Sequence, residues 1–272
     1  MINFKELKGV ERTLFLPLWG RWSESIKGNG LICDNKSIEL VNRMGYDFQT
    51  IENSQHPLTR LAWITRAWNT DHELNRHAPN IPFTAICLGC GLDTAFYRNN
   101  IPLMNWVDVD LPNVIELRRH LMGATKGVTL HAGSILEKNT FETIQTEGRI
   151  IVLALGLLCY FNEIEVKKIM NNLSSLSSNV LIIMDYFSEA GIAISNKMVL
   201  AENNESRMIW YVNNPTDLLS LHDGLDIIET YPLFQKIMPF LSEQEQIAAK
   251  MSDEKRINSL AILKLTDSTF PA

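Results

Sequence analysis

The spacing of apolar positions changes near residue 80. Before it, apolar residues recur with a helical period, and the pattern predicts helices over 36–44 and 58–76. Asp34 stands where a helix N-cap is expected, and Pro79 ends the second helix. Four of the six tryptophans also lie here, at Trp19, Trp22, Trp63 and Trp68. We therefore expect an N-terminal helical cap over residues 1–80.

After residue 80, short apolar runs alternate with amphipathic segments. Strands are predicted at 84–88, 106–109, 128–132, 150–155, 180–186, 226–230 and 261–265. Helices are predicted at 111–121, 162–176, 190–204, 215–221 and 242–256. This alternation is typical of a doubly wound α/β sheet, and the strand–helix–strand ending predicts an antiparallel edge. We expect seven strands, the last antiparallel, in a second domain over residues 81–272.

Composition narrows the classes of function. Hydrophobic residues make up 46% and charged residues 21%, so the chain can form a packed core. The net charge is −6 and no Lys/Arg-rich run is present, which argues against a nucleic-acid partner. No apolar run reaches the roughly 18 residues that would indicate a membrane span. With no signal-type stretch, a cytoplasmic location and a small-molecule substrate are expected.

The cysteines and histidines do not form a metal motif. Cys87 and Cys90 make one C-x-x-C pair, but no second pair completes a zinc site. His72 and His77 are five residues apart, so they do not share a helix face. No metal is expected. We interpret the cysteine pair as small residues at a strand end, with a thioredoxin-like redox role as the alternative.

A glycine turn and an acid follow the first two predicted strands. The turn is Gly89-Cys90-Gly91, and Asp110 comes 21 residues after Gly89. In a doubly wound sheet such an acid can accept both hydroxyls of a ribose. The turn reads G-x-G-x-x-T, and the adjacent Asp93 would repel a pyrophosphate. A cationic nucleoside, S-adenosylmethionine (SAM), therefore fits better than a dinucleotide. The alternative is a tight turn of the kind found in any α/β protein.

Several segments carry a resemblance to a known family. Residues 87–98, CLGCGLDTAFYR, resemble the signature NLGCGLDTRFYR of the leucine carboxyl methyltransferase-like family. Residues 106–112 (WVDVDLP) with Arg118, 156–160 (GLLCY) and 13–19 (TLFLPLW) are similar to further family segments. The resemblance covers nearly the whole chain and is nearest the tetracenomycin-type polyketide O-methyltransferase branch. It implies a Rossmann-like class I SAM-dependent methyltransferase.

The resemblance also implies a cofactor site. The glycine turn would face the methionine part of SAM, Asp110 the ribose, and Ser134 and Ile135 the adenine. Arg66 matches the family arginine that holds the SAM carboxylate. Arg21 is either a second cation there or a solvated helix residue. The full cofactor-binding set predicted is Arg21, Arg66, Gly89, Cys90, Gly91, Asp110, Leu111, Ser134, Ile135, Leu155 and Gly156.

One position departs from the family. Leu155 stands where the family has the glutamate that receives the SAM ammonium group. The expected reaction is methyl transfer to a carboxylate or hydroxyl of a small polyketide-like natural product. Without the glutamate, the SAM amine could instead attack the γ-carbon of the same SAM molecule and form a ring. That cyclisation would give azetidine-2-carboxylate and methylthioadenosine. A non-catalytic SAM-binding protein is the third reading.

The acceptor side of the site carries no known motif. A carboxylate acceptor needs no base, whereas a hydroxyl acceptor would benefit from one. The candidates are Tyr160, Tyr186, Tyr211 and His222, each of which has a packing role as its alternative. We expect the segment near 188–222 to cover the substrate. The Trp-rich cap would bury its aromatic surface over the SAM site or in a homodimer.

Overall fold

The computed structural model describes residues 14–28, 30–44, 48, 56–199 and 207–266. Within them lies a seven-stranded sheet of order β3-β2-β1-β4-β5-β7-β6. The strands are β1 (Phe83–Leu88), β2 (Met104–Asp110), β3 (Val128–Ala132), β4 (Arg149–Ala154), β5 (Asn179–Phe187), β6 (Leu225–Pro232) and β7 (Asn258–Thr266). The first five are parallel, and β7 runs antiparallel between β5 and β6. The predicted fold class is confirmed.

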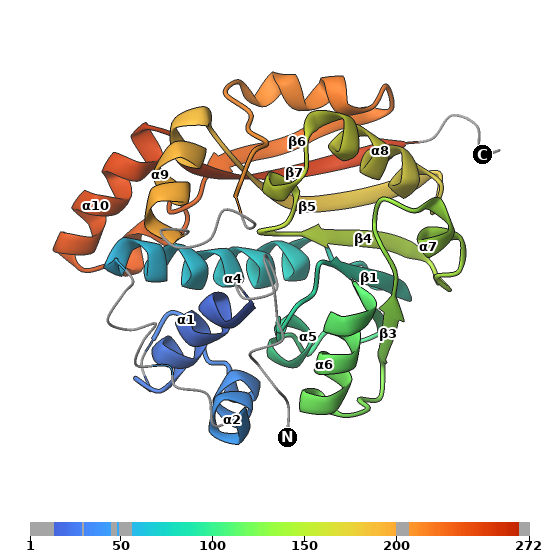
Figure 1. Cartoon of the computed structure of the whole chain (residues 1–272), viewed down its shortest axis with the longest axis horizontal. Coiled ribbons are helices and arrows are strands. Elements are labelled where there is room, and N and C mark those ends of the chain that lie inside the picture. The colour runs from blue at the N-terminus through green and yellow to red at the C-terminus, as the bar shows by residue number, and fades with distance from the viewer. Residues whose placement is uncertain (1–13, 29, 45–47, 49–55, 200–206, 267–272) are drawn as a thin grey trace.

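Helices cover both faces of the sheet (Figure 1). On one face lie α7 (Lys138–Glu142), α8 (Glu163–Ser174) and η5 (Pro215–Leu221). On the other lie α4 (Pro57–His77), α5 (Ala95–Arg98), α6 (Pro112–Met122), η6 (Met238–Phe240) and α10 (Glu243–Glu254). Residues 215–221, predicted as a helix, form a 3₁₀-helix.

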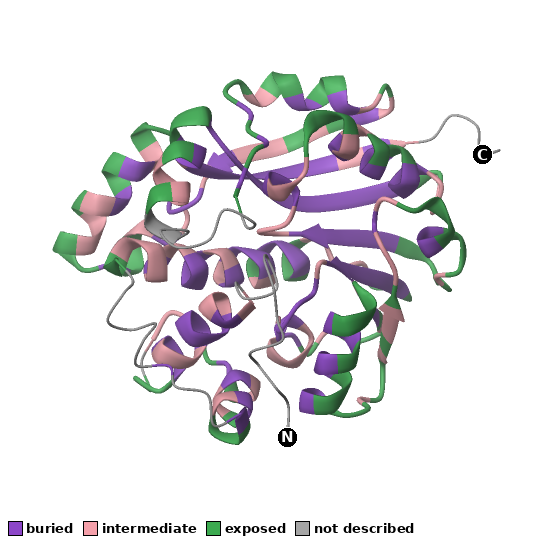
Figure 2. Ribbon diagram, in the orientation of Figure 1, coloured by how far each residue is buried: buried purple, intermediate pink, exposed green. Residues whose placement is uncertain are grey.

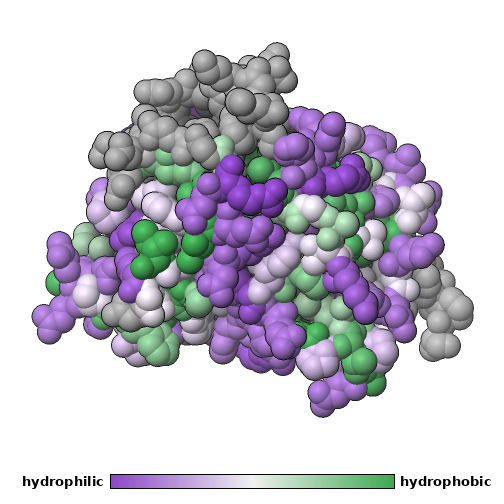
Figure 3. Space-filling model, turned by 90° about the horizontal axis from the view of Figure 1, so that it is seen from below, coloured by the Kyte–Doolittle hydropathy of each residue, from purple (hydrophilic) through white to green (hydrophobic). Residues whose placement is uncertain are grey.

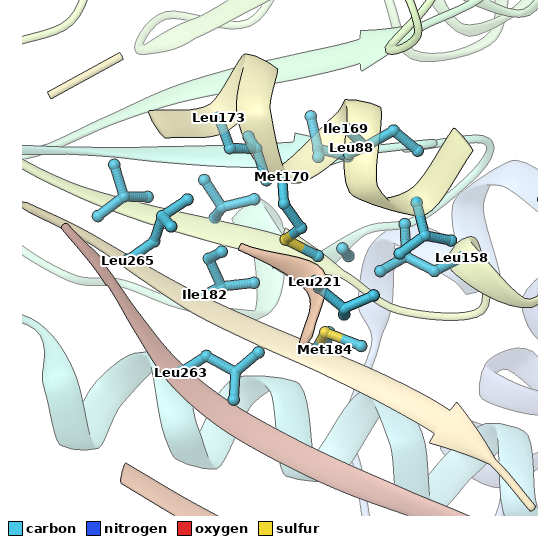
Figure 4. Packing of buried hydrophobic residues seen from close by; sticks show 14 of the residues in the cluster. Leu88, Leu158, Ile169, Met170, Leu173, Ile182, Met184, Leu221, Leu263 and Leu265 are labelled. Atoms are coloured by element: carbon cyan, nitrogen blue, oxygen red, sulfur yellow. The ribbon is translucent and has the colours of Figure 1, made fainter. Parts of the chain in front are cut away.

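The central strands are buried on both faces, which explains their nearly continuous apolar sequences. Every residue of β1 is buried, and so is every residue of β5 after Asn179 (Figure 2). On the α8 face, strand side chains pack against apolar side chains of α8 and η5 (Figure 4). A capping box between Asn162 and Glu165 begins α8, as predicted.

The helices before residue 80 pack around the end of the sheet that carries the glycine turn. They are α1 (Phe15–Ser25), α2 (Asn35–Met44) and α4. Trp19 of α1 meets Trp63 of α4 edge to face, with ring centroids 6.4 Å apart. The same apolar cluster includes Leu92 and Leu121. Asp34 accepts the Ser37 amide at 2.9 Å, which confirms the predicted N-cap.

Several expectations concern parts that the structure does not describe. The cap prediction includes residues 1–13, and the helix predicted over 190–204 is described as α9 (Glu189–Val199) without 200–204. The segment 188–222 likewise contains 200–206. Division into a cap and a catalytic domain stays a prediction, as does the covering role of 188–222.

The face shown in Figure 3 has no feature that identifies a partner. Seen from below, much of the molecule is hydrophilic, with its apolar side chains in separate patches (Figure 3). None of the described helices combines the length and apolarity needed to cross a membrane. A homodimer and a cytoplasmic location stay predictions.

Candidate active site

A cavity of about 390 Å³ opens at the carboxyl ends of β1, β2 and β4. The strand order reverses between β1 and β4, and doubly wound folds bind ligands at such a point. Every residue of the predicted cofactor-binding set lines it: Arg21, Arg66, Gly89, Cys90, Gly91, Asp110, Leu111, Ser134, Ile135, Leu155 and Gly156. The structure thus brings the set together, and the contact of each residue with SAM stays a prediction.

The glycine turn after β1 adopts a backbone shape that other residues disfavour. Gly89 has φ of +57° and Gly91 has φ of +45°, both in the left-handed region. A Cβ on Gly89 would lie 2.6 Å from Leu157 Cδ1, and one on Gly91 would lie 2.5 Å from Leu14 Cδ2. Backbone is therefore presented to the cavity where side chains would fill it. That arrangement suits close approach of a ligand.

Asp110 ends β2 and contacts the glycine turn directly. Its Oδ2 accepts the Gly91 amide at 2.8 Å, and its Oδ1 accepts the Leu111 amide at 2.8 Å. Burial raises the pKa of Asp110, while these two amide donors lower it in part. The carboxylate lines the cavity with both oxygens fixed in place. It is thus positioned for two adjacent hydroxyls of a ribose.

Behind the turn lies a buried arginine for which no role was predicted. Arg118 is 2% exposed and pairs with Asp108 at 2.6 Å. Its Nη1 donates to the carbonyl oxygens of Gly91 at 3.0 Å and Asp93 at 2.7 Å. Trp106 Nε1 donates to the second oxygen of Asp108 at 2.7 Å. Arg118 is not among the residues that line the cavity, so it holds the turn from outside the cavity wall.

The loop after β3 is fixed in a similar way. Ser134 and Ile135 form part of the cavity wall. Because the strand order is β3-β2-β1, this loop and β1 lie on opposite sides of Asp110. The Ser134 carbonyl accepts the Thr140 hydroxyl at 2.8 Å, and the Ile135 carbonyl accepts Asn172 Nδ2 at 3.1 Å. These bonds anchor the proposed adenine end of the cavity to α7 and α8.

Arg21 is a buried structural cation. It is 2% exposed, so its reading as a solvated helix residue is wrong. Its Nε donates to Asp34 Oδ2 at 3.1 Å and its Nη2 to the Leu92 carbonyl at 2.7 Å. Its Nη1 lies 3.5 Å from Asp93 Oδ2. These contacts turn the guanidinium toward the protein and tie α1 to the glycine turn.

Arg66 differs from Arg21 in its exposure. Its side chain is 17% exposed, lines the cavity from α4, and lies 3.4 Å from Asp185 Oδ2 through Nη1. Within the described residues, Asp185 is the carboxylate that pairs with it. Arg66 therefore suits the carboxylate of a bound amino acid better than Arg21 does.

An acid–arginine network joins the N-terminal helices to the glycine turn. Arg98 contacts Asp71 at 2.7 Å and Asp34 at 3.3 Å. Burial alone raises the pKa of Asp93, but Arg21, Arg98 and the Ala95 amide bring it down to about 2. The charge of Asp93 is thus compensated. Its repulsion of a pyrophosphate is weaker than the sequence suggested.

The remainder of the cavity wall is largely apolar. It includes Leu14, Trp63, Leu155, Leu157 and Phe161. Among the described residues, Asp93 and Asp110 are the carboxylates that line the cavity. Leu155 directly follows β4 and lines the same cavity.

The four catalytic candidates separate in space. Tyr160, in η3 (Leu158–Tyr160), lines the cavity. Tyr186 is 3% exposed and packs in the cluster on the α8 face, and burial raises its pKa. Tyr211 borders a different hollow. His222 accepts the Gly224 amide on Nδ1 at 2.9 Å. The last three do not line the cavity; Tyr186 is packed in the core, whereas Tyr211 is 43% exposed, and their catalytic roles stay predictions.

The cysteine pair is buried. Cys87 and Cys90 are free thiols, 8% and 1% exposed. Burial raises the pKa of each thiol well above its usual value. A buried, protonated thiol is a poor nucleophile, which favours the packing interpretation over a redox role. No group of three or more His, Cys, Asp or Glu side chains that could hold a metal is found among the described residues.

The fold, together with the family and the relatives given next, defines a class I SAM-dependent methyltransferase. A putative methyltransferase from Thermobifida fusca YX has the same fold, with a TM-score of 0.57 at 14% identity over 92% of this chain and 94% of that one. Residues 27–174 match the model of the leucine carboxyl methyltransferase family, and the chain belongs to this family.

Two curated proteins are similar over most of their length. The tetracenomycin polyketide synthesis O-methyltransferase TcmP of Streptomyces glaucescens is 25% identical over 243 residues, which cover 89% of this chain and 88% of that protein. The S-adenosyl-L-methionine-dependent methyltransferase dpfgK of Gibberella zeae is 24% identical over 241 residues, 80% of each chain.

The residues present fit SAM. The glycine turn leaves room for the methionine portion of SAM to lie close to the backbone. The fixed carboxylate of Asp110 matches the ribose, and the half-buried Arg66 matches the methionine carboxylate. When bound, SAM supplies a methyl group activated by a positively charged sulfur.

Proposed function

We propose that the chain is an O-methyltransferase that modifies a carboxylate or hydroxyl oxygen of a small, largely apolar metabolite of the polyketide type. The observation that carries this proposal is one cavity with two kinds of wall. A polar cradle of Gly89, Gly91 and Asp110 lies beside an apolar wall that includes Trp63 and Phe161. The similarity to a polyketide O-methyltransferase supports the acceptor class.

Each part of the proposed site has one task. Asp110 binds the ribose hydroxyls, and the loop at Ser134 and Ile135 holds the adenine. Gly89 and Gly91 let the backbone approach the methionine portion. Arg66 binds the carboxylate of that portion. We assign Arg21 no direct contact with SAM, because its Nε and Nη2 already donate to protein oxygens.

Methyl transfer from SAM needs little covalent help from the protein. Its rate depends on holding the acceptor oxygen in line with the methyl carbon and on excluding water. The apolar wall supplies the exclusion, and Arg66 and Asp110 fix the donor end. For a hydroxyl acceptor, Tyr160 is the candidate that receives or relays the proton, because it lines the cavity. A carboxylate acceptor requires no such step.

A second reaction is favoured by one observation. Leu155 lines the cavity and offers no charge to an amine, and the described wall provides no carboxylate besides Asp93 and Asp110. A desolvated amine has a lower pKa and becomes nucleophilic. Intramolecular attack on the γ-carbon would break the carbon–sulfur bond, giving azetidine-2-carboxylate and methylthioadenosine. A binding protein without catalysis is the remaining alternative.

Mass spectrometry of the nucleoside product separates these proposals. The chain is incubated with SAM alone, and with SAM plus a panel of phenolic and carboxylic polyketide-like acceptors. Methyl transfer yields S-adenosylhomocysteine (SAH) and an acceptor heavier by one methylene, and only when the acceptor is present. Methylthioadenosine formed from SAM alone would establish the cyclase instead. Neither product, with SAH binding intact, would favour a binding protein.

A further inference from the structure

A carboxylate lies on the face of β5 that packs beneath α4. Leu181 and Ile183 belong to the cluster beneath α4, and Asp185 follows on the same face because side chains alternate along a strand. Asp185 is 2% exposed. A buried carboxylate is costly unless hydrogen bonds and a cation compensate it. The partners of Asp185 therefore indicate why it is there.

Those partners come from three separate parts of the chain. Asp185 Oδ1 accepts the Gly156 amide at 2.6 Å, in the turn after β4. Its Oδ2 accepts Asn258 Nδ2 at 3.2 Å, at the start of β7. The same Oδ2 lies 3.4 Å from Arg66 Nη1, on α4. In the described chain Arg66 is the cation of this group.

Gly156 constrains the same guanidinium from a second direction. Its φ is +65°, and a Cβ there would lie 2.5 Å from Arg66 Nη1. The guanidinium thus lies directly against the backbone of the turn, which Asp185 in turn holds through the amide. Arg66 and Gly156 line the cavity, whereas Asp185 is not among its lining residues. Asp185 therefore acts on Arg66 from outside the cavity wall.

We propose that Asp185 is a positioning residue for the amino-acid portion of SAM. Its pairing with Arg66 and its bond to the turn at Gly156 fix the guanidinium, so that the remaining donors face the ligand carboxylate. This inference rests on the proposed role of Arg66. Asp185 acts through Arg66 and has no contact with the reacting atoms.

Two ligands test the proposal without any acceptor. SAH carries the amino-acid portion, whereas methylthioadenosine has the same adenosine and lacks that portion. Dissociation constants for both are measured by calorimetry. Asp185→Asn keeps the shape and an oxygen for the Gly156 amide but removes the charge. It is expected to weaken SAH binding by about tenfold and to leave methylthioadenosine within about twofold. Asp223→Asn, at an exposed position, is the matched control and changes neither constant.

The outcomes identify which idea fails. Arg66→Ala should abolish the preference for SAH over methylthioadenosine, and a preference that survives would remove Arg66 from the site and with it the basis of the proposal. Suppose instead that Arg66→Ala behaves as expected. If Asp185→Asn then lowers the affinity for both ligands equally, or changes neither affinity, Asp185 is structural and the inference is overturned. Should Asp185→Asn not fold, Asp185→Glu keeps the charge but moves the carboxylate by one methylene relative to Arg66 and the Gly156 amide. The same selective loss of SAH affinity is expected, and equal affinity changes for both ligands would again refute the proposal.

Discussion

Replacement of Asp110 by asparagine tests the nucleoside end of the cavity. The two carboxylate oxygens accept the amides of Gly91 and Leu111, each at 2.8 Å. An asparagine has nearly the same shape and keeps one accepting oxygen. Its NH₂ group necessarily faces one of the two amide donors, and it cannot accept a second ribose hydroxyl. The change therefore affects both the empty turn and the bound ligand.

The magnitude follows from the bonds exchanged. Hydrogen bonds to a charged group contribute about 1.5–3 kcal/mol each, and neutral ones about 1 kcal/mol. Loss of one charge-assisted bond and weakening of the other should cost about 2 kcal/mol of binding free energy. That corresponds to roughly a 30-fold higher dissociation constant for SAH. The mismatched amide should lower the free energy of unfolding by about 1 kcal/mol.

Calorimetry with adenosine and 2′-deoxyadenosine separates a ribose contact from a general loss of structure. The wild-type chain should prefer adenosine, and Asp110→Asn should remove most of that preference. Urea unfolding of the unliganded variant measures the stability change independently. An SAH affinity within twofold of wild type, in a variant that unfolds cooperatively, would refute the placement of the ribose at Asp110.

Two further predictions concern charge at the same site. Leu155→Glu should tighten SAM binding by pairing with the ammonium group. If the chain is a methyltransferase, methyl transfer should stay intact, whereas if it is a cyclase, methylthioadenosine formation should be suppressed. Unchanged SAM affinity and unchanged turnover would show that residue 155 does not face the ligand. Asp93 has a pKa of about 2 in the folded chain against a usual 3.8, so its ionised form stabilises the fold above about pH 4 and this contribution is lost as the pH falls toward 2. Asp93→Asn should flatten the acid side of the stability profile measured by urea unfolding, and an identical profile would contradict the pairing with Arg21 and Arg98.

Much of the fold could be predicted because its signals are local. Each signal depends on only a few neighbouring residues. Examples are the apolar runs of β1 and β5 and the capping box at Asn162 and Glu165, which lie where they were expected. The glycine turn and Asp110 were identified because strand ends in a parallel sheet meet at one edge. Their adjacency, with Gly91 bonded to Asp110, follows from that topology.

The parts that could not be predicted depend on distant partners or on which face a residue occupies. Asp185 meets Gly156, Asn258 and Arg66 across 29, 73 and 119 residues of sequence, and no local pattern records such contacts. Tyr186 follows Asp185 near the end of the same strand, but the alternation of side chains turns it to the opposite face from Asp185. Position near a strand end therefore did not predict that Asp185, rather than Tyr186, contacts residues of the cavity wall.

The difference in exposure among the four thiols allows chemical labelling to detect opening of the structure. Cys33 is exposed, one residue before the N-cap of α2, while Cys87, Cys90 and Cys159 are buried. A maleimide dye added to the native chain should therefore attach at a single place, next to the helices that surround the cavity. Each further thiol that reacts records an opening of the sheet or of the turn beside it. Mass spectrometry of labelling over time would then show how tightly a ligand closes the molecule, without any mutation.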